Sequence, residues 1–152
     1  MIDGFLLKEF RRYYNVVPGK YVPVYLNLAE GTWMVDYGLT GRVAIITGAN
    51  NPWGIGATTA LAFAREGAKV VLVYKKVFRP FDATKTDRNG VDRYYGANAG
   101  NTEAVECKLR EMNADYIVIE SDISDEKAVK EIYSAVLEKY GRVDILFNNA
   151  AT

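Results

Sequence analysis

The stretch that decides the fold runs from Ala44 to Tyr74 and reads AIITGANNPWGIGATTALAFAREGAKVVLVY. An apolar run ends in a glycine-rich turn, and a segment of small and apolar residues leads to a second apolar run. Apolar runs bounded by turn signals are typical of buried strands. Gly67 stands where a left-handed residue commonly ends a helix. The stretch therefore predicts a strand over 42–47, a helix over 54–66 and a strand over 69–74.

The same alternation continues along the chain. Apolar runs predict two more strands over 116–119 and 143–148. Helices are expected over 101–112 and in the segment that ends at Gly141, with Ser124 as its N-terminal cap. Parallel neighbours need a crossover, which a helix supplies. Right-handed crossovers then favour an α/β fold: an incomplete Rossmann-type parallel sheet of about four strands in the order 3-2-1-4, with flanking helices.

Composition excludes several classes of function. The 152 residues carry no net charge, which gives no global reason to expect nucleic acid or a membrane surface as partner. No apolar run approaches the ~18 residues that a membrane span needs, so we expect a cytoplasmic protein. The chain has no histidine and one cysteine. This excludes Ser-His and Cys-His nucleophile pairs and an internal disulfide, and we expect no metal site.

Two regions are expected. Residues 1–37 form an N-terminal extension, read as an arm packed on the body or on a neighbouring subunit. A short helix is expected from Phe5 to Tyr14, and Pro23 argues against a central strand in the apolar segment around it. Residues 38–152 form the nucleotide-binding half-domain, interrupted by a long inserted loop over 75–100.

The glycine turn has the features that phosphate binding requires. These are a tight turn, close backbone approach and a helix N-terminus with unpaired N–H groups. Gly48 can make the turn, whereas Gly54 and Gly56 lack the Cβ atoms that would hold a pyrophosphate or the next strand away. Such a pattern is informative because it lies between a strand and a helix.

Three motifs carry a resemblance to the short-chain dehydrogenase/reductase family. TGANNPWGIG resembles the family's cofactor turn, T-G-x-x-x-G-x-G, with five residues instead of three between the first two glycines. We expect the two extra residues to bulge outward. SDISD resembles the motif in which Asp122 would accept a hydrogen bond from the adenine amine. FNNAA resembles the N-N-A-G motif, in which Asn148 and Asn149 would tie the sheet together and line the cofactor groove.

The sequence and the resemblance together give a set of expected cofactor-binding residues. They are Gly48, Asn50, Trp53, Gly54, Ile55, Gly56, Tyr74, Lys75, Lys76, Asp122, Ile123, Asn148, Asn149 and Ala150.

The end of the second strand favours NADP(H) over NAD(H). In NAD-preferring Rossmann folds an acidic residue about 20 positions beyond the glycines binds the ribose 2′-hydroxyl. Here Tyr74 occupies that region, and Lys75 and Lys76 follow it. An ammonium group attracts a 2′-phosphate, whereas a carboxylate repels it. The alternative is that both lysines are only solvated charges.

The inserted loop is longer than most βα connections. Residues 75–93 contain six basic and three acidic side chains. A basic flap beside the adenosine phosphate, a plain surface insertion and a subunit contact all remain open.

The resemblance implies a reaction for which this sequence lacks the residues. Family members transfer a hydride to or from a carbonyl or secondary alcohol, using a serine and a Tyr-x-x-x-Lys pair. None of the eleven tyrosines here has a lysine four residues later, so no catalytic residue is assigned. We expect a truncated NADP(H)-dependent oxidoreductase acting on a small-molecule substrate. The alternatives are a non-catalytic dinucleotide-binding module, or a homo-oligomer or partner chain that covers strand four.

Overall fold

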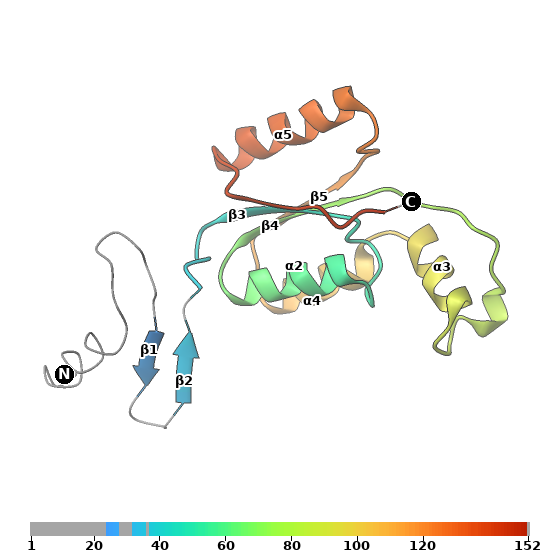
Figure 1. Ribbon diagram of the computed structural model, residues 1–152, viewed down its shortest axis with the longest axis horizontal. Helices are drawn as coiled ribbons and strands as arrows, with labels where there is room; N and C mark the ends of the chain where they lie inside the picture. The colour runs from blue at the N-terminus through green and yellow to red at the C-terminus, as the bar shows by residue number, and fades with distance from the viewer. Residues whose placement is uncertain (1–23, 28–31, 36, 152) are drawn as a thin grey trace, which may run out of the picture. The chain divides into compact units, whose positions relative to one another are not determined.

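The computed structural model describes residues 24–27, 32–35 and 37–151 (Figure 1). The chain divides into two compact units, Met1–Gly38 and Leu39–Thr152. In the first unit β1 (Val24–Asn27) pairs with β2 (Thr32–Val35) as an antiparallel ladder. The helix expected from Phe5 to Tyr14 lies outside the described residues.

A four-stranded parallel sheet forms the second unit. Its strands are β3 (Val43–Thr47), β4 (Lys69–Tyr74), β5 (Tyr116–Glu120) and β6 (Ile145–Phe147), in the order β5-β4-β3-β6. In the central strand β3, Ala44 lies opposite Val70 on one side and Ile145 on the other. The predicted order 3-2-1-4 is therefore confirmed.

Helices cover both faces of this sheet (Figure 1). α2 (Ile55–Arg65) and α4 (Glu103–Glu111) pack on one face, and α5 (Glu126–Tyr140) packs on the other. Side chains alternate between the faces of a strand. Ala44 and Ile46 therefore join the core beneath α2 and α4, whereas Val43 and Ile45 join the core beneath α5.

Two helix ends lie where the sequence places them. Gly67 follows α2 with φ +77°, and Gly141 ends α5 with φ +71°, a conformation that glycine adopts without steric cost. The N-terminal cap of α5 was predicted one residue too early. Asp125, not Ser124, accepts the capping hydrogen bond from Lys127 N. The Ser124 hydroxyl donates instead to Asp122.

The inserted segment was expected to be irregular over 76–100, and this expectation was wrong. The segment holds a 3₁₀ turn, η1 (Ala83–Lys85), and a helix, α3 (Val91–Ala99). The sequence does not predict α3, because the helix contains Gly96 and has no apolar stripe. The glycine has a packing reason. A Cβ at Gly96 would lie 3.2 Å from both the Phe81 ring and the Thr86 methyl group.

Within the residues that the structure describes, no helix has both the length and the hydropathy that crossing a membrane would require.

Candidate cofactor site

The glycine turn connects β3 to α2 at the carboxyl ends of the parallel strands, where α/β folds bind ligands. Gly48 has φ +68°, and a Cβ there would lie 2.9 Å from the Ala150 Cα atom. A Cβ at Gly56 would lie 2.6 Å from both the Asn149 amide nitrogen and the Gly48 carbonyl oxygen. The two glycines therefore allow the turn, the first turn of α2 and the chain after β6 to meet.

The N-terminus of α2 has no side-chain cap. Its N-cap residue is Gly54, and among the residues that the structure describes no side-chain cap hydrogen bond is made there. Ile55, the first helical residue, is 71% exposed. Uncapped N–H groups and the positive end of the helix dipole favour an anion at this position.

The chain after β6 is tied to the turn by Asn149 and Thr47. The Asn149 side-chain amide donates to the carbonyl oxygens of Thr47 and Gly48, at 3.0 and 3.1 Å. The Thr47 hydroxyl oxygen accepts from the backbone N–H groups of Asn149 and Ala150. Asn148 is exposed and makes none of these bonds. Thr47 was not singled out from the sequence, where it reads only as the end of a strand.

The lengthened turn folds partly inward, and of its residues 49–53 only Trp53 is exposed, whereas Pro52 is half-buried. Asn50 and Asn51 are buried. Asn50 Nδ2 donates to the carbonyl oxygens of Asn98 and Gly100, at 3.0 and 3.1 Å. Asn51 Nδ2 donates to Asn98 Oδ1 at 3.1 Å. The expected cofactor residue Asn50 thus uses its side-chain amide to hold the inserted segment.

The ends of β4 and β5 bring together the residues expected to read the ribose and the adenine. Lys75 forms an ion pair with Asp122, and Lys76 pairs with Glu120 at 3.1 Å. The pKa of Asp122 is lowered to about 2, mainly by Lys75 and then by the Ser124 hydroxyl and N–H. Each lysine is therefore already matched with a carboxylate.

Tyr74, the last residue of β4, contacts one of these carboxylates, that of Glu120. Its hydroxyl donates to Glu120 Oε2 at 2.9 Å. Burial, followed by this carboxylate, raises the tyrosine pKa. The bond from Tyr74, together with Lys76, lowers the pKa of Glu120. Tyr74 therefore fixes a carboxylate at the strand end rather than offering a free hydroxyl. Ile123 is partly exposed beyond β5.

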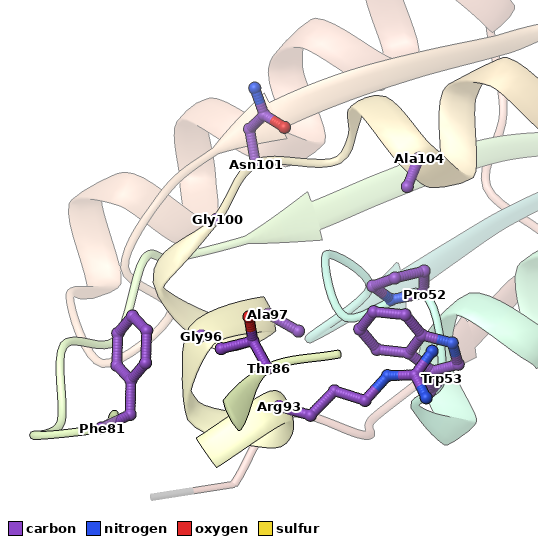
Figure 2. A pocket seen from close by; sticks show the side chains of 10 residues that line it. All are labelled: Pro52, Trp53, Phe81, Thr86, Arg93, Gly96, Ala97, Gly100, Asn101 and Ala104. Atoms are coloured by element: carbon purple, nitrogen blue, oxygen red, sulfur yellow. The ribbon is translucent and has the colours of Figure 1, made fainter. Parts of the chain in front are cut away.

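A cavity of about 390 Å³ opens between the lengthened turn and the inserted segment (Figure 2). Its walls come from the turn, from the segment around η1 and α3, and from the start of α4. Its lining residues are Pro52, Trp53, Phe81, Thr86, Arg93, Gly96, Ala97, Gly100, Asn101 and Ala104. Among the residues described, no group of three or more Asp, Glu, Cys or His side chains could hold a metal ion.

Comparisons with known proteins agree on one family. The family model described as short chain dehydrogenase matches residues 83–152. An uncharacterized oxidoreductase of Thermotoga maritima is 36% identical over 74% of this chain, which spans 35% of that protein. An NADH-dependent reductase complexed with NAD is 30% identical, with a TM-score of 0.52 over 76% of this chain and 38% of its own.

A metagenomic short-chain oxidoreductase in complex with NADP is also similar. It is 30% identical, with a TM-score of 0.53 over 75% of this chain and 41% of its own. This chain thus spans 35% to 41% of the length of these relatives. The fold, the three motifs and these matches together place the chain in the short-chain dehydrogenase/reductase family.

Proposed function

We propose that this chain binds NADP(H) as the cofactor-binding part of an oxidoreductase. The uncapped N-terminus of α2 carries the proposal, because Gly48 and Gly56 leave no side chain of their own around it. The residues fit a pyrophosphate. Unpaired N–H groups would donate to its oxygens, and the helix dipole would stabilise its charge. Asn149 and Thr47 hold the chain after β6 beside the turn.

The bound nicotinamide would accept or donate a hydride, and the substrate would be a small carbonyl compound or secondary alcohol. The residues described here would bind and orient the cofactor. We assign no proton donor or acceptor to this stretch of chain. Preference for NADP(H) is supported by the sequence at the end of β4, where Lys75 and Lys76 follow Tyr74 and no acidic residue occupies the position that binds the ribose 2′-hydroxyl in NAD-preferring folds. Related structures contain NAD or NADP, so both cofactors occur in the family.

The test uses Ile55, whose exposed side chain allows substitution without repacking the core. Ile55→Glu places a negative charge at the N-terminus of α2, which favours the helix but repels a pyrophosphate. Titration with NADPH, followed by calorimetry, is expected to show binding by the wild type and much weaker binding by Ile55→Glu. Ile55→Gln, of similar size and without charge, should retain binding. Equal NADPH affinity in the Glu and Gln variants would contradict the proposed site.

A second candidate is a subunit that needs another chain to complete its sheet. Among the described residues, β6 hydrogen-bonds to β3 alone, and Leu146 of β6 is 46% exposed. An uncovered apolar edge strand is suited to pairing with a further strand. This candidate predicts activity only after mixing with a partner, whereas a binding module alone would bind NADPH without turnover.

A further inference from the structure

The basic residues of the inserted segment fall into two groups, according to whether they contact a carboxylate or an aromatic ring. Four of the six between residues 75 and 93 form ion pairs with carboxylates: Lys75, Lys76, Lys85 and Arg88. The other two lie over aromatic rings, Arg79 over Tyr95 and Arg93 over Trp53. Within the described part of the chain, neither of these two arginines has an ion pair. Their charges are therefore the ones available to an anionic ligand.

Arg93 is the arginine of this pair that lines the cavity (Figure 2). Its guanidinium carbon lies 3.7 Å from the centroid of the Trp53 ring, so the group is held by a cation–π contact. Nη1 donates to Asn89 Oδ1 at 2.8 Å. Nε is shielded from solvent and has no hydrogen-bond partner among the residues that the structure describes. A buried donor without an acceptor costs free energy, which an incoming oxyanion would recover.

The position of Trp53 links this arginine to the cofactor site. Trp53 directly precedes Gly54, the N-cap of α2, where the proposed pyrophosphate would lie. In a dinucleotide the adenosine ribose is attached to the pyrophosphate. The 2′-phosphate of NADP(H) is therefore expected close to the turn. A guanidinium forms bidentate hydrogen bonds with phosphate, and an arginine near a Rossmann turn can accommodate the 2′-phosphate.

We propose that Arg93, held against Trp53, binds the 2′-phosphate of NADP(H) and that the inserted helix α3 thereby selects the cofactor. This inference rests on the proposed function. It assigns a lesser role to Lys75 and Lys76, because each is already paired with a carboxylate. Nε, which has no partner among the described residues, marks the side of the guanidinium that would meet the phosphate.

The test compares NADP⁺ and NAD⁺ affinities of three variants by calorimetry on the full 152-residue chain. Arg93→Met is expected to weaken NADP⁺ binding about 10- to 100-fold, the equivalent of one charged hydrogen-bonded contact. Its NAD⁺ affinity should stay unchanged. Arg79→Met is the matched control, since Arg79 also lies over a ring but does not line the cavity. Lys75→Met should lose less NADP⁺ affinity than Arg93→Met.

Arg93→Lys is a second variant that keeps the proposal testable if Arg93→Met fails to fold. Lysine keeps the charge but loses the bidentate geometry, so an intermediate NADP⁺ affinity supports the proposal. An unchanged NADP⁺ to NAD⁺ ratio in both Arg93 variants would overturn it and leave the proposed function standing. A larger loss in Lys75→Met would also overturn it. A wild-type chain that binds neither dinucleotide would instead overturn the proposed function.

Discussion

Gly56 is the residue at which α2, the glycine turn and the chain after β6 come into contact. Gly56→Ala would place a methyl group 2.6 Å from the Asn149 amide and the Gly48 carbonyl, and neither can move without breaking the bond between them. Overpacking of this kind costs about 1–3 kcal/mol. We expect the free energy of unfolding in urea to fall by that amount.

The control for Gly56→Ala is Ala62→Ser, on the exposed side of the same helix. It should change the free energy of unfolding by less than about 0.5 kcal/mol. An unchanged or higher free energy of unfolding in Gly56→Ala would contradict the close approach, because the higher helix propensity of alanine would by itself stabilise α2.

Asp144 couples stability to pH because its carboxylate joins the starts of β3 and β6. It accepts hydrogen bonds from Arg142, from Val43 N at 2.9 Å and from Arg42 at 3.1 Å. Arg142 first, and then the Val43 N–H, hold the pKa of Asp144 well below its usual range. A lowered carboxylate pKa stabilises the fold above the unfolded pKa of about 4, and the contribution disappears as pH falls below it.

We therefore expect Asp144→Asn to lower the urea midpoint at pH 7 and to reduce the further loss of stability between pH 7 and pH 3. The matched control is Asp87→Asn, whose side chain is 79% exposed. It should behave like the wild type at both pH values. The same acid sensitivity in wild type and Asp144→Asn would contradict this assignment.

At the scale of elements, α3 is attached to the body largely through the lengthened turn. Asn98 accepts from Asn50 and Asn51 side chains and, through its carbonyl oxygen, from Val77 N. Asn50→Ala would remove the amide donor that the carbonyl oxygens of Asn98 and Gly100 share in a part-buried setting, a loss of about 1–3 kcal/mol. We expect α3 to open more often while the sheet stays folded.

Hydrogen exchange resolved by peptide tests this expectation. Protection should fall over residues 91–99 in Asn50→Ala and stay unchanged over β4. Arg88→Ala, on the exposed side of the same segment, is the control and should exchange like the wild type. Uniform loss of protection across the sheet would indicate global unfolding instead.

At the scale of the whole molecule, the second unit presents an apolar edge. Among the described residues β6 pairs on one side only, and Leu146 is exposed there. Leu146→Lys is expected to reduce self-association, because a charge on an edge strand opposes pairing with another edge. Light scattering after size exclusion measures it. Phe78→Lys makes the same change at an exposed apolar residue outside the sheet, and should leave association unchanged. Equal effects would exclude β6 as the contact.

Much of the fold was predictable, because parallel strands that are buried on both faces have nearly continuous apolar sequences. The run at 69–74 matches β4 in full, and the other strands differ by one to three residues at their ends. The inserted helix α3 was missed, since Gly96 and its polar residues give it no helical signal. The gathering of the three motifs at one end of the sheet also follows from parallel topology.

The sequence by itself determined the order of the strands, the glycine turn and the family, because each depends on local residue types and on the handedness of short connections. Tertiary structure alone decided which polar groups already have a hydrogen-bond or ion-pair partner. Asn50 meets the carbonyl of Asn98 from 48 positions away, and Lys75 meets Asp122 from 47. Arg93 stacks on Trp53 although they lie in different elements. Such pairings depend on how the folded elements pack, so no spacing along the chain reveals them.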